Sequence, residues 1–300
     1  MQSHTRYYEA AGITIQVNSD YLLSDTTFHP KFNAFECRAP GKDHISINHH
    51  FCPPDPSITG KTLIYDKNQW QIFKSPDFWF YTYTPGSDET GFGPVTGIFN
   101  ADHSVADIYL EISQKDYSNA RFNALTLFNT DQVLFARILN NTEGLILHSN
   151  GFEIDGRGIL LTGHSGAGKS TLSRMLKQKD AHILCDDRMF IKSCPPGFRI
   201  YGHWNHGSVS DVSSKSAPLK AVFFLEQAKE NQIIKIEDKK QISLNLFQSV
   251  VKQFLTREEW NTTFDTLEKM INTIDCYTIK FNLDGKICDK IFQLLSRYPL

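Results

Sequence analysis

The stretch Gly163-His-Ser-Gly-Ala-Gly-Lys-Ser170 carries the strongest pattern in this sequence. It matches the phosphate-loop (Walker A) pattern G-x-x-x-x-G-K-[ST] at every position, with an apolar strand pattern before it and an amphipathic helix pattern after it. Its glycines let the backbone wrap closely, so that N–H groups and the positive end of the helix face the phosphates. The motif predicts a nucleotide site formed by nine residues: Gly163, His164, Ser165, Gly166, Ala167, Gly168, Lys169, Ser170 and Thr171.

Two side chains of this motif have chemical roles of their own. Lys169 supplies a mobile positive charge to the outer phosphates of ATP or ADP, and Ser170 presents a hydroxyl to Mg²⁺. The alternative is a glycine-rich turn with an incidental lysine, although average residue usage makes a chance match roughly a one-in-a-hundred event at this length. The cofactors expected from the motif are therefore ATP and Mg²⁺.

Two aspartates follow the predicted helix, at the end of the apolar run Ala181-His-Ile-Leu-Cys185. Adjacent carboxylates on an extended chain point to opposite sides, so one of Asp186 and Asp187 can approach Mg²⁺ while the other approaches an acceptor hydroxyl. The alternative is an exposed Asp-Asp-Arg turn. His148 follows the predicted strand 145–147, and a lone histidine there is usually a satisfied core residue rather than a catalytic group.

The chain is predicted to have two parts. Residues 1–143 form a β-rich N-terminal domain, in which segments such as Trp79-Phe-Tyr-Thr-Tyr83 are separated by Pro, Gly and Asp clusters. Apolar residues at helical intervals predict one helix there, over about residues 120–139. Residues 144–300 are predicted to alternate strands and helices. The strands lie at 145–147, 152–154, 159–161 and 220–225. One helix begins near Lys169, and a later helix contains Ile242, Leu246, Val250 and Phe254.

Composition excludes several classes of protein. Lys and Arg (31) nearly balance Asp and Glu (33), so no charge excess favours nucleic acid or an anionic membrane. No apolar run approaches the roughly 20 residues that span a bilayer, and the N-terminus lacks a signal-peptide pattern, so a cytoplasmic protein is expected. The six cysteines form no C-x-x-C pair and are expected to be reduced. His49-His50 with Cys52 lack a second ligand cluster and are predicted to be a solvated strand end.

Taken together, the elements around the loop suggest a family. Leu147-His148, the segment from Phe152 to Ser170, and Cys185-Asp-Asp187 resemble, in order and spacing, the catalytic core of bacterial HPr kinase/phosphorylase, a relative of the ATP-dependent phosphoenolpyruvate carboxykinases. The resemblance covers about residues 144–225. It implies an α/β phosphate-loop core with a mixed sheet and flanking helices, preceded here by the β-rich region. It also implies that Asp186 is the acid/base, that His148 and Asp187 position it or the metal, and that Ser165 contacts phosphate.

The chain departs from this pattern in two places. The bifunctional enzymes typically have Glu after Lys-Ser, where this chain has Thr171, and their downstream glycine-rich signature is missing. The sequence therefore resembles divergent HPr-kinase-like proteins, and HPr need not be its substrate. In the loop that follows, Trp204, His203 and His206 are predicted either to line an acceptor site or to form an aromatic cap on the core.

The function expected from the sequence is ATP-dependent transfer of a phosphoryl group to a hydroxyl of a protein, a peptide or a small molecule, with serine as the favoured acceptor residue. Lys169, Asp186, Asp187 and His148 are the predicted catalytic residues, and Ser170 and Asp187 the predicted metal ligands. The alternatives are a nucleotide-binding regulatory module without transfer and a phosphoenolpyruvate carboxykinase-like enzyme, for which 300 residues is short. A homo-oligomer is compatible with either.

Overall fold

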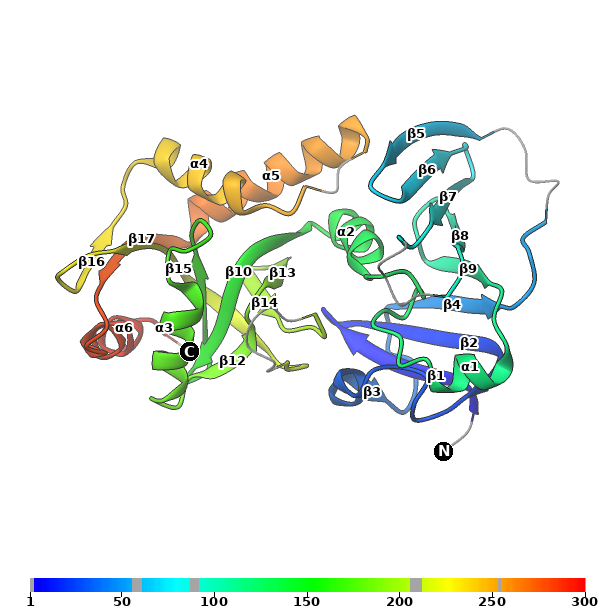
Figure 1. The fold of residues 1–300 in the computed structure, drawn as a ribbon. Coiled ribbons are helices and arrows are strands. Elements are labelled where there is room, and N and C mark those ends of the chain that lie inside the picture. The colour runs from blue at the N-terminus through cyan, green and yellow to red at the C-terminus, as the bar shows by residue number, and fades with distance from the viewer. Residues whose placement is uncertain (1–2, 56–60, 87–91, 206–211, 253–254, 300) are drawn as a thin grey trace. The chain divides into compact units, whose positions relative to one another are not determined.

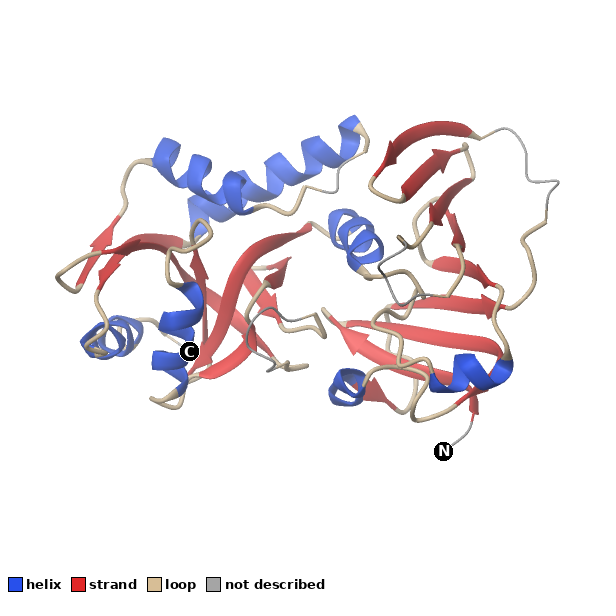
Figure 2. Cartoon of the chain, viewed as in Figure 1, coloured by secondary structure: helices blue, strands red, loops and turns tan. Residues whose placement is uncertain are grey.

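A computed structural model describes residues 3–55, 61–86, 92–205, 212–252 and 255–299 of the protein (Figure 1). The chain divides into two compact units, Met1–Ile138 and Leu139–Leu300, each built on its own sheet. Both sheets contain parallel and antiparallel neighbours, so the fold is α/β with two mixed sheets and few helices (Figure 2). The boundary expected after residue 143 falls in the turn between α2 (Gln132–Asn141) and β10 (Gly144–Ile154).

The first unit contains a sheet of nine strands in the order β3-β1-β2-β4-β9-β8-β7-β6-β5, in which β4 is parallel to both β2 and β9. The strands are β1 (Ser3–Ala10), β2 (Ile13–Leu23), β3 (Glu36–Cys37), β4 (His44–His50), β5 (Thr62–Lys67), β6 (Trp70–Lys74), β7 (Phe78–Tyr83), β8 (Val95–Asn100) and β9 (Val105–Leu110). A 3-10 helix (Pro30–Phe35), α1 (Gln114–Asn119) and α2 complete the unit. Alternating apolar residues such as Ile15, Val17 and Ile47 are fully buried, as expected for a sheet with one face toward the core.

The helix predicted over residues 120–139 is wrong in its first half. Residues 120–131 form turns, and the helix begins only at Gln132. The Asp131 carboxylate accepts hydrogen bonds from the backbone N–H groups of Leu125 and Thr126, at 2.8 and 2.9 Å, and the Asp131 carbonyl accepts one from Phe135 N. This side chain therefore closes the preceding turn and starts the helix, a local competition that apolar spacing does not show.

His49 is not part of a solvated strand end, contrary to the prediction. Its side chain is fully buried, with Nδ1 2.7 Å from the Tyr117 hydroxyl and Nε2 2.8 Å from the Leu125 carbonyl oxygen. Burial lowers the pKa of His49 to about 4, because the charged imidazolium would lose its hydration. His50, next along β4, points to the other face and lies between Asp20 and Asp107.

The second unit contains a sheet of eight strands whose pairing closes on itself. β11 (Arg157–Thr162), β10, β13, β14 and β15 are neighbours in turn, and β15 pairs back with β11 in parallel. β12 pairs with β10, and β17 and β16 extend from β15. The remaining strands are β12 (His182–Cys185), β13 (Arg188–Cys194), β14 (Gly197–Tyr201), β15 (Ser216–Gln227), β16 (Gln232–Lys235) and β17 (Asp275–Phe281).

Helices cover both faces of this sheet (Figure 1). Those of the second unit are α3 (Lys169–Lys177), α4 (Lys239–Ser249), α5 (Arg257–Thr273) and α6 (Lys286–Leu295). Along β15, Val222 and Phe224 belong to the core under α4 and α5, whereas Phe223 and Leu225 belong to the core under α3 and α6. A strand buried on both faces is continuously apolar, as the run 220–225 predicted. Within the described residues, no helix combines the length and apolar character needed to cross a membrane.

The burial of His49 predicts that the fold loses stability in mild acid. Because its folded-state pKa lies below the ordinary 6.5, the unfolded chain takes up the proton first, and stability falls as the pH drops from 6.5 toward 4. The shift corresponds to a loss of about 3 kcal/mol at the lower end. His103, whose pKa burial lowers to about 3, adds a loss of the same sign. Urea unfolding across this pH range measures the slope.

Two histidine variants separate this effect from general acid denaturation. His49→Gln should flatten the slope, whatever its cost at neutral pH. His50→Gln should not flatten it: burial lowers the pKa of His50, but hydrogen bonds to Asp107 and Asp20 outweigh this and raise it. An unchanged slope in His49→Gln would contradict the assignment.

Candidate functional site

The glycine-rich loop, residues 163–168, joins the buried end of β11 to the start of α3. Gly166 and Gly168 have φ angles of +82° and +100°, values that residues with a Cβ rarely adopt. Ala167 is buried, whereas His164, Ser165 and Gly166 are exposed. The loop is therefore a tight turn whose outer side is open to solvent.

Lys169, the first residue of α3, turns back into this loop. Its Nζ donates to the Gly163 carbonyl at 2.7 Å and lies 3.5 Å from the His164 carbonyl oxygen. The Gly166 carbonyl accepts a hydrogen bond from Gln227 Nε2 on β15, at 2.7 Å. The α3 N-terminus has no side-chain cap, because residue 168 is glycine, and its first turn has no acidic residue. A lysine amine and an uncapped helix N-terminus together favour an anion at this loop.

The two aspartates lie where the strand beside β10 is interrupted. Both β12 and β13 pair with β10 in antiparallel fashion, with β12 ending at Cys185 and β13 beginning at Arg188. The Asp187 carbonyl accepts a hydrogen bond from Ser149 N at 3.0 Å, which holds the interruption against β10. His148 is the residue of β10 directly opposite Arg188.

The structure brings His148 and Asp187 into contact, and the charge of Asp187 acts on Lys169. The distance from His148 Nδ1 to Asp187 Oδ1 is 3.2 Å. The hydrogen bond from His148 lowers the pKa of Asp187, and burial of the carboxyl opposes it. Partial burial lowers the pKa of Lys169, and the negative charge of Asp187 opposes that shift. Of the two aspartates, Asp187 is therefore the one whose charge affects the pKa of the loop lysine. The other, Asp186, is only 5% exposed.

A cavity of about 720 Å³ borders the loop. His148, Arg188 and the first loop residues form one side of it, and β15, β17 and the end of α4 form the rest. The lining residues are His148, Gly163, His164, Ser165, Arg188, Phe224, Leu225, Glu226, Asn245, Gln248, Ser249, Val250, Val251 and Thr278. The volume and the mixed polar and apolar lining are typical of a small-ligand site.

Hydrogen bonds hold the end of α4 and the residues after it against β10 and β11, the two strands that lead into the site. The Ser249 hydroxyl lies 2.5 Å from that of Thr162, the residue before the loop. Val251 N donates to the Ile146 carbonyl at 2.9 Å, and Val250 bridges to Leu147. Asn245 and Gln248 are thereby held in the cavity wall. Sequence reasoning missed these α4 residues, as well as Gln227 and Arg188, because they belong to no motif.

Ser170 and Asp187, the metal ligands expected from the sequence, have the donor chemistry of a nucleotide-bound Mg²⁺ site. The described residues contain no group of three or more His, Cys, Asp or Glu side chains arranged to hold a metal ion by themselves. Mg²⁺ bound through a nucleotide takes only one or two protein oxygens besides phosphates and water. Ser170 and Thr171 are half-buried in the first turn of α3, and the charge of Asp187 acts on Lys169 in the same turn, so the donor set consists of hydroxyl and carboxylate oxygens, which Mg²⁺ accepts.

The first residues of the loop after β14, 202–204, are packed into the protein core. Trp204 and His203 are 0% and 1% exposed, and the His203 ring stacks on Phe190 with centroids 4.0 Å apart. Between the two predictions for this loop, the structure supports the aromatic cap. His206 lies outside the described residues.

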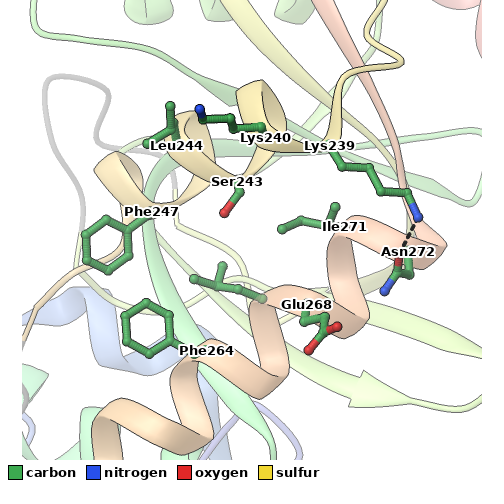
Figure 3. A pocket seen from close by; sticks show the side chains of 10 residues that line it. Lys239, Lys240, Ser243, Leu244, Phe247, Phe264, Glu268, Ile271 and Asn272 are labelled. Carbon is green, nitrogen blue, oxygen red and sulfur yellow. Dashed lines mark hydrogen bonds between the residues drawn. The ribbon is translucent and has the colours of Figure 1, made fainter.

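A second pocket lies between α4 and α5 (Figure 3). Apolar side chains of α4 and α5 line a groove of about 510 Å³, in which Leu244 and Phe264 are 55% and 49% exposed. Lys239, at one end of the groove, donates a hydrogen bond to Asn272 (Figure 3). None of the residues predicted for the nucleotide site lines this groove.

Fold and site together define a mixed α/β protein whose glycine-rich loop, between a strand and a helix, adjoins a cluster of Lys, His and Asp side chains. A family model described as "SynChlorMet cassette protein ScmC" matches residues 113–296, more than half of the chain. The chain belongs to this ScmC family. No curated protein matches it.

Solved structures similar to this chain include the Hpr(Ser) kinase/phosphatase from Coxiella burnetii. The identity is 16% and the TM-score 0.29, over 51% of this chain and 94% of that one. A similarity at this level carries no argument about fold or chemistry. The resemblance to HPr kinase noted in the sequence therefore stays a prediction.

The loop glycines give a matched pair of stability predictions. At Gly168 the φ angle is unfavourable for alanine, and a Cβ would lie 2.7 Å from Phe281 Cζ. Gly166 has a similar φ angle but no atom within 4 Å of a Cβ. Gly166→Ala should cost about 1 kcal/mol of unfolding free energy through backbone strain, and Gly168→Ala clearly more. Equal losses in urea unfolding would show that the contact with Phe281 relaxes freely.

Proposed function

We propose that this protein is an ATP-dependent kinase that transfers the γ-phosphoryl group to a hydroxyl of a protein, peptide or small molecule. The observations that support this best are the Lys169 amine turned into the glycine-rich loop, where the charge of Asp187 acts on it, and the contact of Asp187 with His148. The loop supplies binding for the phosphates, and the pair supplies a proton acceptor. A protein that only bound nucleotide would need the first and not the second.

The position of Lys169 indicates which way the nucleotide lies. In loops of this type the lysine reaches the β- and γ-phosphates. Its amine now lies at the carbonyls of Gly163 and His164, and these residues also line the cavity. The γ-phosphate would therefore face the cavity, which makes the cavity the place for the acceptor. Ser170 and Asp187 would hold Mg²⁺, which supplies positive charge to the phosphates.

His148 is the proton acceptor best placed for this reaction. Its side chain is 49% exposed and lines the cavity, and the contact between its Nδ1 and Asp187 fixes its orientation. The acceptor hydroxyl gives its proton to Nε2 as its oxygen bonds to the γ-phosphorus, and the bond from that phosphorus to the bridging oxygen of ADP breaks. Asp186, the base expected from the sequence, is 5% exposed and does not line the cavity.

Nucleotide binding should appear as a thermal shift. A ligand bound only by the folded state raises its stability by about 2.7 kcal/mol at a hundredfold excess over the dissociation constant. We expect millimolar ATP or ADP with Mg²⁺ to raise the melting temperature of the wild type, and Lys169→Ala to abolish most of the increase. Lys177→Ala, at the exposed far end of the same helix, should keep it. No shift in the wild type would refute the proposed function.

The proton acceptor is tested by comparing three variants. His148→Gln should lower phosphoryl transfer by roughly two to four orders of magnitude and leave ATP affinity within a few fold, because glutamine cannot accept the proton. Asp187→Asn should also raise the Mg²⁺ concentration required. Asp186→Asn should have the smallest effect on transfer per folded molecule. The measurement is transfer of label from γ-labelled ATP to an acceptor isolated from a fractionated lysate.

Two results would change the conclusion. A large loss in Asp186→Asn together with normal transfer by His148→Gln would return the base role to Asp186. Tight ATP binding by the wild type without transfer to any fraction would favour the regulatory module.

A further inference from the structure

We propose that Arg188 is a further catalytic residue, a cation supplied by the chain itself that binds the phosphoryl group during its transfer. The inference rests on the proposed function and extends it. Arg188 lies outside the sequence motif and directly follows the aspartate pair, at the first position of β13.

Strand pairing places Arg188 beside His148. The two residues are direct partners in the antiparallel pair of β10 and β13, so their side chains leave the sheet on the same face. Both residues line the cavity, whose wall also includes the first residues of the loop. The Arg188 side chain is 35% exposed. A group held between the loop and His148 would therefore lie next to this guanidinium.

The guanidinium keeps most of its hydrogen-bonding capacity. Its Nε lies 3.6 Å from Asp187 Oδ2, a contact that orients the planar group. Among the described residues, no hydrogen bond or ion pair involves its two terminal amino groups. Two parallel N–H donors on one rigid plane match two oxygens of a phosphoryl group.

The charges around the loop leave a need for a second cation, which Arg188 can supply. Asp187 opposes the charge of Lys169, and the cavity wall contains one carboxylate, Glu226, which has Lys280 as an ion-pair partner at 3.9 Å. A transferring phosphoryl group spreads negative charge over its three outer oxygens and needs more than one cation. Among the described residues that line the cavity, Arg188 is the one lysine or arginine, and a guanidinium stays charged in proteins.

The test uses aluminium fluoride, which with ADP and Mg²⁺ mimics the phosphoryl group during transfer, and compares its binding with that of ADP and Mg²⁺ alone. Transition-state mimics bind at least a hundredfold more tightly than ground-state ligands when the stabilising groups are in place. We expect aluminium fluoride to tighten ADP binding to the wild type by tenfold or more. In Arg188→Gln, aluminium fluoride should no longer tighten ADP binding. The affinity of this variant for ADP alone should stay within about threefold of the wild-type value. Arg174→Gln, which removes an exposed arginine from α3, is the matched control and should behave as the wild type.

A structural role for Arg188 gives a different pattern. If Arg188 only balanced the charge of Asp187, then Arg188→Gln would have no effect in an Asp187→Asn background at a Mg²⁺ concentration that restores the gain from aluminium fluoride; we expect Arg188→Gln to abolish that gain there too. Retention of the gain by Arg188→Gln would overturn the inference while leaving ADP binding intact. So would ADP binding by the wild type that aluminium fluoride does not tighten. Failure of the wild type to bind ADP at all would instead overturn the proposed function.

Discussion

The backbone hydrogen bond from Ser149 N to the Asp187 carbonyl, 3.0 Å long, is the constraint on which the arrangement of the site depends. It lies where the strand beside β10 is interrupted, between Cys185 and Arg188. Because β10 is unbroken through this region, it fixes His148 relative to both Asp187 and Arg188. If the partner strand slipped by one residue, its side chains would exchange faces and the contact between His148 and Asp187 would be lost.

The glycine-rich loop is also held in place by β10. β11, which leads into the loop, pairs with β10 on one side and β15 on the other, so that the ring of strands closes beneath the loop. Asn150 on β10 donates to the Ser173 hydroxyl at 2.7 Å, and Ser173 in turn donates to the Lys169 carbonyl. These bonds tie the first turn of α3 to the strand that carries His148. Lys169 and His148 are thus both held in position by β10.

The sequence predicted the parts of this site that have local patterns and missed those that arise from packing. The loop and the start of α3 follow from glycines, a lysine and an amphipathic run. The segments 145–147 and 152–154 were predicted to be separate strands but belong to β10, because Ser149 and Asn150 break the apolar pattern although both are fully buried. The bond to Ser173, a contact made 23 residues away in the chain, satisfies the amide nitrogen of Asn150, whereas its buried Oδ1 has no hydrogen-bond partner among the described residues. The contribution of α4 to the cavity likewise depends on pairing between distant segments, for which single-sequence periodicity has no signal.

The contact of the Lys169 amine with the loop carbonyls has a consequence for the speed at which the loop can respond. The backbone is already wrapped, and its curvature is supported by Ala167 in the core and by Gln227 on β15. An anion that enters therefore needs one long side chain to turn, and no chain segment to refold. Exposed side chains rotate within picoseconds to nanoseconds, whereas collective closure of a lid takes microseconds to milliseconds. Capture of the proposed nucleotide would accordingly require rotation of one side chain and no collective closure of the loop.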